Sequence, residues 1–164
     1  MFREMRRTKQ YLPEEECIDI LKNGTSGVLA VSGDDDYSYA VPLSYAYNDG
    51  KLYFHCALVG HKIDAIKKNN KVSFCVIGQD KIIPEEFTTY FNSVIAFGRA
   101  RMVEDNDEKI AILKILSDKY SPGLEKEADE EIAALLDKTG VLEITIEHMT
   151  GKEGKYLAEQ RRKA

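Results

Sequence analysis

The segment VPLSYAYNDGKLYFHCALVGHK, from Val41 to Lys62, reads as two short strands and the start of a helix. Larger apolar residues alternate with smaller or polar ones on both sides of residues 48–50, which is the period of a strand with two different faces. The Asp-Gly pair in that turn is typical of a tight hairpin, since glycine readily takes a positive φ. After Ala57 the apolar residues follow helical spacing. The segment therefore predicts a β-hairpin and then a helix that begins near Gly60 or His61.

The start of this helix carries two basic residues, His61 and Lys62. A helix N-terminus presents free N–H groups and partial positive charge, so basic side chains there do not stabilise the helix itself. They are useful if an anion such as a phosphate binds at that end. A solvated basic turn is the alternative, and these residues alone leave both interpretations open.

The composition of the 164 residues, with 43% hydrophobic and 31% charged residues, is typical of one globular domain. No apolar run is long enough to span a membrane, and the basic N-terminus lacks the apolar stretch of a secretory signal. The net charge of −5 argues against nucleic acid as a partner, because a phosphate backbone attracts basic surfaces. Cys17, Cys56 and Cys75 show no Cys-x-x-Cys spacing, so we expect reduced thiols in a cytoplasmic protein.

Alternating or short apolar runs predict further strands at residues 27–31, 37–47, 71–77, 92–103 and 141–149. In the last of these, Leu142, Ile144 and Ile146 are expected to point inward and Glu143, Thr145 and Glu147 outward. Helices are expected after Pro13, after an N-terminal cap at Asp107, and through Leu135. Residues 78–90, which contain Pro84, are expected to be an irregular connection. Six or seven strands with few helices predict a mainly β fold, an antiparallel sheet closed into a small barrel.

The whole chain, residues 1–164, is expected to form a single domain with its core at about residues 13–150. Residues 1–12 form a basic N-terminal arm, which is either solvated or lies across a neighbouring subunit or an anionic ligand. Residues 151–164 form a polar tail that is helical or frayed. The residues of the arm are compatible with a solvated arm, with contact to a neighbouring subunit and with contact to an anionic ligand.

Neither a hydrolytic triad nor a metal site is indicated by the sequence. No Gly-x-Ser-x-Gly elbow surrounds Ser44, and Cys56 points away from His55 on the same strand. The three histidines have no metal-ligand spacing, so the metal prediction is none. Without further context, His55 is interpreted as a histidine of the core or of its rim.

The motifs VPLSYAY, GKLYFHCALVGHKIDAIKKNNKVSFCV and YFNSVIAFGRARMV resemble, in this order, the pyridoxamine-phosphate-oxidase-like family of flavin split barrels. Within it, the sequence is most similar to the branch of 5-nitroimidazole-resistance (Nim) proteins. The basic start MRR, the Tyr-Phe-His-x-Ala strand, the Gly-basic-Lys turn and the Thr-Gly-Lys of the last strand all match. The resemblance covers roughly residues 5–152. It implies a six-stranded antiparallel split β-barrel, a homodimer, and FMN bound at the dimer interface.

The resemblance also assigns residues to the cofactor. Those expected around the ring, the ribityl chain and the phosphate of FMN are Pro42, Leu43, Ser44, His55, Cys56, Ala57, His61 and Lys62. The first three would face the ring through backbone groups, and the last two would hold the phosphate. His61 stands where the family more often has arginine, which makes this contact pH-dependent. Ser93 and Val94 are expected to reach the pocket from the other subunit, and Lys152 to lie at its rim.

Together these features predict an FMN-dependent oxidoreductase of the nitroreductase type that reduces a small molecule. The flavin would carry electrons, and His55 would stand beside the substrate as a proton donor or as an aromatic wall. One alternative is a flavin-binding redox-sensing module without turnover, and another is the same barrel with haem or a deazaflavin. A pyridoxamine-phosphate oxidase is less expected, because the basic residues around its substrate phosphate have no match here.

Overall fold

The structure, a computed structural model, describes residues 2–163. Its strands are β1 (Tyr11–Leu12), β2 (Ser26–Ser32), β3 (Ser38–Ser44), β4 (Ala46–Asn48), β5 (Lys51–Cys56), β6 (Lys71–Ile83), β7 (Thr88–Met102) and β8 (Gly140–Glu153). Its α-helices are α1 (Glu14–Asn23), α2 (His61–Lys68), α3 (Asn106–Tyr120), α4 (Glu125–Leu135) and α5 (Lys155–Arg161). The predicted hairpin at residues 48–50 and the helix that begins at His61 are both confirmed.

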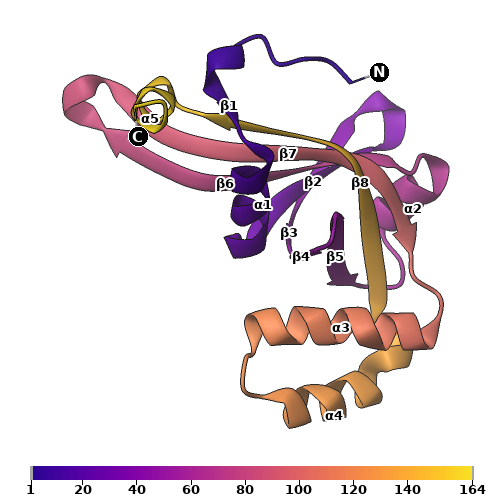
Figure 1. The fold of residues 1–164 in the computed structure, drawn as a ribbon. Helices are drawn as coiled ribbons and strands as arrows, with labels where there is room; N and C mark the ends of the chain where they lie inside the picture. The colour runs from indigo at the N-terminus through magenta and orange to yellow at the C-terminus, as the bar shows by residue number, and fades with distance from the viewer. Residues whose placement is uncertain (1, 164) are drawn as a thin grey trace.

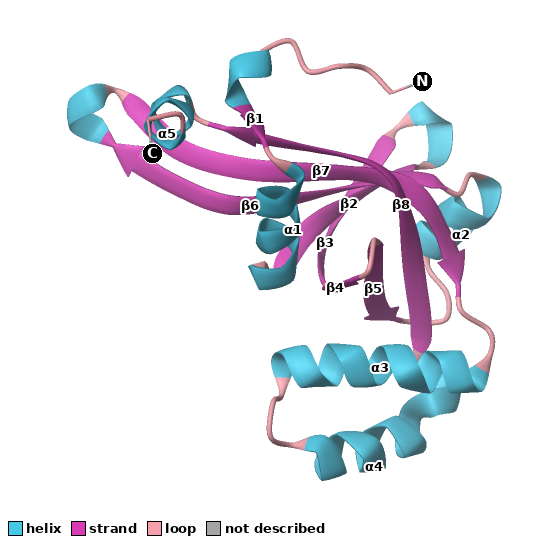
Figure 2. Cartoon of the chain, in the orientation of Figure 1, coloured by secondary structure: helices cyan, strands magenta, loops and turns pink. Residues whose placement is uncertain are grey.

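The strands form one antiparallel sheet that curls into a barrel (Figure 2). Their hydrogen-bonded order is β3-β2-β6-β7-β8-β5-β4, and only Tyr45 separates β3 from β4 along the chain. The two ends of the order are thus halves of one interrupted strand, which closes a ring of six strands. This confirms the predicted six-stranded antiparallel split barrel. The short β1 pairs with the last part of β8.

Three aromatic rings fill the middle of the barrel. Tyr45, Phe54 and Phe74 are fully buried. Phe74 meets the other two rings edge to face, with ring centres 4.9 and 5.1 Å apart, a favourable arrangement of aromatic quadrupoles. The Tyr45 hydroxyl donates a 2.7 Å hydrogen bond to the backbone oxygen of Leu21 in α1. The core therefore fixes α1 as well as the strands.

Burial along the strands confirms most of the predicted faces. In residues 71–77 and in the barrel part of β7, every second side chain is buried. Glu143 points outward as predicted, but it is buried. Its side chain lies on the outer face of β8, yet it is only 2% exposed, because the Lys51 and Arg101 side chains and α3 cover it.

Residues 78–90 form strands instead of the predicted irregular connection. β6 and β7 stay paired through this stretch, with Gln79 opposite Asn92. A register shift between Ile77 and Gln79 separates the barrel part of the pair from a long two-stranded arm that projects beyond it (Figure 1). Pro84 lies in the 3₁₀ turn at the tip, where a missing backbone N–H costs no sheet hydrogen bond.

α3 and α4 form a helical hairpin at one end of the barrel (Figure 1). α3 packs Ile112 and Leu116 against Tyr53 and Val141 on the outer face of the sheet. α4 contributes no buried side chain within the described residues, so it is joined to the barrel mainly through α3. No helix between residues 2 and 163 is both long and apolar enough to cross a membrane.

Candidate functional site

The N-terminus of α2 has the features of an anion-binding site. Gly60 has a φ of +137°, and nothing lies within 4 Å of where its Cβ would stand, so the backbone conformation alone requires glycine. Its oxygen accepts hydrogen bonds from the N–H groups of Ile63 and Asp64 at 2.9 and 3.0 Å. The N–H groups of His61 and Lys62 have no partner among the described residues. They can hold an anion, with the Lys62 side chain adding positive charge.

The His61 side chain is already engaged with its own chain. Its Nε2 lies 3.6 Å from the Asp34 carboxylate, and its ring stacks on Tyr39 with 4.3 Å between ring centres. A hydrogen bond from Lys68 lowers the pKa of Asp34, and the charge of His61 also contributes. An incoming phosphate would compete with Asp34 for His61. Lys62 is therefore the more available cation of the two.

β3 offers small side chains next to a free strand edge. It stands at the end of the strand order, so one of its edges pairs with no described strand, a position in a sheet that tolerates a proline such as Pro42. The outward side chains Ala40, Pro42 and Ser44 are small and exposed, whereas Leu43 packs against the core. A planar ligand can lie close to this backbone, and only the backbone of Leu43 is open to it.

Ser44 and His55 line one cavity between the barrel and the α3–α4 hairpin. Ser44 ends β3, where it stands opposite Ser26, and His55 lies near the end of β5, opposite Val141. The cavity encloses about 500 Å³, within the usual range for small-molecule sites. Its apolar wall comes from α3 and α4, through Leu113, Leu116, Ile132 and Leu135.

Tyr120 anchors the C-terminal end of α3 beside this cavity. Its hydroxyl accepts a 3.0 Å hydrogen bond from the N–H of Tyr45 and lies 2.6 Å from the backbone oxygen of Thr25. Lys119 donates to the backbone oxygen of Gly24, and burial lowers the pKa of this lysine. This wall of the cavity was not predictable from the sequence, because an amphipathic pattern shows that a helix has an apolar face but not which strands it covers.

Cys56 and Ala57 continue β5 toward α2, but Cys56 packs against the core, opposite in direction to His55. Burial raises the pKa of the Cys56 thiol, and the nearby charge of Lys62 offsets only part of that effect. The thiol is therefore protonated at neutral pH and is a poor nucleophile. Cys56 can line a ligand through its backbone, whereas Ala57 is exposed.

The remaining predicted residues lie on the other side of the barrel. Ser93 stands opposite Lys152 in the β7–β8 register, and both are partly exposed. Val94 points into the core and is fully buried, so its side chain cannot touch a ligand. β7 is three strands from β3 in the sheet order, or about 14 Å at the usual strand spacing. The structure therefore groups residues 42–62 together and sets Ser93 and Lys152 apart from them.

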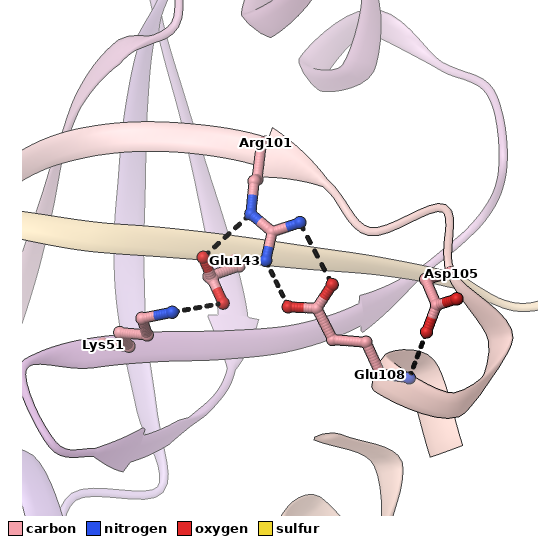
Figure 3. Close-up of polar contacts among 5 residues, drawn as sticks. All are labelled: Lys51, Arg101, Asp105, Glu108 and Glu143. Atoms are coloured by element: carbon pink, nitrogen blue, oxygen red, sulfur yellow. Dashed lines mark hydrogen bonds and ion pairs between the residues drawn. The ribbon is translucent and has the colours of Figure 1, made fainter. Parts of the chain in front are cut away.

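An ion-pair network fixes the N-terminal end of α3 to the sheet (Figure 3). Arg101 Nε donates to Glu143 Oε1 at 2.9 Å, and Lys51 Nζ donates to Glu143 Oε2 at 3.1 Å. The Arg101 guanidinium also pairs with Glu108 in the first turn of α3. Asp105, not the predicted Asp107, caps this helix by accepting a 2.9 Å hydrogen bond from the N–H of Glu108. α3 is thus held at both ends, which fixes one wall of the cavity.

The six-stranded ring with a ligand-sized cavity on its outer surface defines an antiparallel split-barrel protein. A family model described as pyridoxamine 5'-phosphate oxidase matches residues 13–153, which is most of the chain. The chain therefore belongs to the pyridoxamine 5'-phosphate oxidase family. A comparison with curated proteins found no match.

Several solved structures share this fold. An FAD-binding protein from Mesorhizobium loti is 27% identical, over 89% of this chain and 98% of that one, with a TM-score of 0.64. A candidate 5-nitroimidazole antibiotic resistance protein from Bacteroides thetaiotaomicron is 19% identical, over 87% and 86% of the two chains, with a TM-score of 0.74. An FAD and haem binding protein from Mycobacterium smegmatis is 20% identical, over 90% and 74%, with a TM-score of 0.72. The last two show the fold alone.

Proposed function

We propose that this chain is an FMN-dependent oxidoreductase of the nitroreductase type, which reduces a small and largely apolar molecule. The observation that carries the proposal is the cavity that Ser44 and His55 share at the free edge of β3. Membership of the family supports a flavin, and the Mesorhizobium loti relative binds one, as FAD. The nitroimidazole-resistance branch rests on the resemblance of the sequence motifs, and the Bacteroides thetaiotaomicron protein shares the fold.

The residues present fit an FMN molecule. The N–H groups of His61 and Lys62, which have no partner among the described residues, suit its phosphate, and the Lys62 side chain supplies a charge-assisted contact. The small outward residues of β3 suit a flat ring that lies against the backbone from Pro42 to Ser44. When bound, FMN supplies the electron transfer. The chain then holds the substrate against the apolar wall of the cavity, keeps water away, and places His55 beside the reacting group.

FMN retention tests the phosphate assignment. Lys62→Ala should weaken FMN binding about tenfold or more, because a hydrogen bond to a charged group contributes about 1.5–3 kcal/mol. Lys67→Ala is the matched control, since Lys67 is an exposed lysine at the other end of the same helix. Affinity is measured by fluorescence titration of the apoprotein with FMN. Equal affinity in wild type and Lys62→Ala would show that the phosphate binds elsewhere.

We also propose that the protein works as a homodimer. A row of outward residues crosses the barrel at Pro42, Val28, Cys75 and Ile95, each opposite the next in the strand registers. Val28 and Ile95 are 40% and 38% exposed, an apolar surface that a second copy would cover. The family resemblance implies a homodimer with the flavin at the interface, and Ser93 of β7 was expected to reach the flavin of the other subunit.

The dimer should appear in solution at about 37 kDa, twice the 18.6 kDa of the chain, when mass is measured by light scattering at micromolar concentration. Ile95→Asp should shift the protein toward monomer and lower its flavin content, because a charge would be buried in the interface. Tyr37→Asp serves as control, since Tyr37 is exposed in the β2–β3 turn, outside the row. A monomeric wild type that still holds flavin would refute the shared pocket.

The proposed activity is tested on the purified protein. We expect an FMN absorption spectrum, FMN in the mass spectrum of the released ligand, and reduction of a nitroaromatic by reduced nicotinamide. Bound flavin without turnover would favour a redox-sensing module, and a haem or deazaflavin spectrum would replace the cofactor assignment. We place the protein in the cytoplasm, where its cysteines, none of them disulfide-bonded in the structure, stay reduced.

A further inference from the structure

A second cavity lies between the N-terminal arm and α5, at the opposite end of the molecule from α2 (Figure 1). It encloses about 550 Å³, again a size typical of small-molecule sites. The charged residues that line it are five cations and one carboxylate, namely Arg6, Arg7, Lys9, Lys155, Arg162 and Glu159. The basic arm is thus one wall of a concave site.

Most of this positive charge is unbalanced within the described part of the chain. Glu159 lies 3.7 Å from Lys155. Arg162 donates a 2.7 Å hydrogen bond to a neutral acceptor, the backbone oxygen of Lys9. No carboxylate of residues 2–163 forms an ion pair with an arginine of the arm. One carboxylate against five cations leaves a strongly positive cavity in a chain whose net charge is −5, and an anion bound there would relieve the repulsion.

Other contacts hold the arm in place. β1 pairs with β8, with Leu12 opposite Gly151. Arg161 donates from Nη2 to the backbone oxygen of Tyr11 at 2.7 Å and pairs with the buried Glu153 at 2.6 Å. Because these anchors do not use Arg6 or Arg7, those side chains are free to bind, and the site is largely organised before a ligand arrives.

Gln10 adds a neutral polar group to the same wall. Its side chain is only 7% exposed, and its Oε1 has no hydrogen-bond partner among the described residues. A buried amide oxygen without a partner destabilises the protein. This oxygen is inaccessible to solvent, so the Gln10 side chain would have to turn toward the cavity for a hydroxyl or N–H group of a ligand to remove the penalty.

We propose that this cavity binds a small phosphorylated molecule that also carries hydroxyl or amino groups, such as a nucleoside diphosphate. Arginine binds phosphate oxygens through paired N–H donors, and the Gln10 amide suits a hydroxyl or amine of the same ligand. The charges converge on a concavity, whereas nucleic acids and membranes need basic residues spread over a face. The site is separate from the phosphate site proposed at Lys62.

Calorimetric titration of the full-length protein, as purified, with ADP and with pyrophosphate tests this site. We expect one ADP per chain, and at least tenfold weaker binding of both probes by the double variant Arg6→Gln/Arg7→Gln, which loses charge-assisted contacts. The double variant Lys126→Gln/Lys138→Gln is the matched control, because it removes the same charge from exposed positions near the helical hairpin. Its affinity should stay within twofold of wild type.

A second variant distinguishes the contribution of the Gln10 amide to binding from that of the basic side chains. Gln10→Leu should weaken ADP binding several-fold and leave pyrophosphate binding unchanged, since pyrophosphate offers no sugar hydroxyl or base amine. Its melting temperature shows that the arm remains folded. Equal losses for both probes in a folded Gln10→Leu would overturn the role of the amide.

The proposal fails as a whole if neither probe binds saturably at millimolar concentration, or if the lysine control loses as much affinity as the arm variant. It also fails if Lys62→Ala, and not the arm variant, abolishes ADP binding, because the probe then occupies the other phosphate site. Tighter binding of a single-stranded oligonucleotide than of ADP would assign the surface to nucleic acid. A shift of the arm variant to monomer without loss of ADP affinity would place the arm across a neighbouring subunit.

Discussion

Replacing His55 with alanine is expected to slow the reduction of a nitroaromatic about 10²–10⁴-fold, the usual contribution of a positioned proton donor, while FMN stays bound. His55 is exposed into the cavity that Ser44 shares, so it can reach a substrate there. The phosphate of FMN is proposed to bind at the start of α2, so replacing the His55 imidazole should leave that contact with the cofactor intact. Stopped-flow oxidation of the reduced, FMN-loaded protein by the nitro compound measures the effect.

His55→Phe separates the two possible roles of this residue. If the imidazole transfers a proton, phenylalanine should be as slow as alanine, whereas an aromatic wall should keep the wild-type rate. Ser121→Ala is the control, because Ser121 lines the same cavity from the end of α3 and should change the rate less than threefold. Wild-type rates in both His55 variants would remove His55 from the chemistry.

Arg101→Met should lower the free energy of unfolding by about 3 kcal/mol, the low end of what breaking a buried ion pair costs. The variant leaves the buried Glu143 carboxylate with Lys51 as its only partner. Arg101 itself is 47% exposed, so solvent screening argues against a larger value. Replacing the Glu143 carboxylate, as in Glu143→Gln, should lower the free energy of unfolding by less, because Lys51 and Arg101 are partly exposed and water can hydrate them when they lose this partner. Urea unfolding gives both values.

Arg99→Met is the control for this substitution on the same strand. Arg99 pairs with Glu147 on the surface, where both side chains are more than one-third exposed, and such pairs contribute less than about 1 kcal/mol. If the two arginine variants lose the same stability, the buried network has no special role.

The effect of Arg101→Met should also depend on pH. Burial raises the pKa of the Glu143 carboxyl, but hydrogen bonds from Arg101 and Lys51 outweigh burial, so the pKa lies below its ordinary value near 4.5. A lowered folded-state pKa contributes stability that is present above the unfolded value and is lost as pH falls through the folded value. In Arg101→Met the carboxyl loses one of the hydrogen bonds that lower its pKa, while burial still raises it. The Glu143 carboxyl therefore protonates at a higher pH in the variant than in wild type. The stability difference between wild type and Arg101→Met should therefore be smaller at pH 4 than at pH 7.

Local chemistry made much of the fold predictable from sequence. The Asp-Gly turn, the alternation along β6 and β7, and the glycine before α2 each depend on the residues present and on their immediate neighbours. The stretch from 78 to 90 was mispredicted because its pairing depends on the facing strand and not on its own composition. The burial of Glu143 could not be predicted for a similar reason, since alternation gives the direction of a side chain but not what covers it.

The residues of the candidate site also fall into two groups, those with a local signal in the sequence and those that come together only through packing. Pro42 and His55 could be singled out because a proline in a strand and a lone histidine are local signals, whereas Ser44 was assigned to the site only through the resemblance to the family. The part of the cavity built by α3 and α4 could not be singled out, because Leu116 and Ile132 lie far from His55 in sequence and meet it only through the packing of the hairpin. The engagement of His61 with Asp34 and Tyr39 is likewise a contact between separate elements.

The uneven attachment of the helical hairpin has a consequence for how substrates enter. α3 is clamped at both ends, whereas α4 buries no side chain of its own, and its surface ion pair with α3, Lys114 to Asp129 at 2.9 Å, holds it only weakly. We therefore expect α4 to separate from the barrel more readily than α3 does, so the amide hydrogens of α4 should exchange with solvent long before those of β6 and β7. Molecules too bulky for 500 Å³ could then be admitted by displacing a single helix, which makes the α3–α4 turn the natural place to widen or narrow substrate choice.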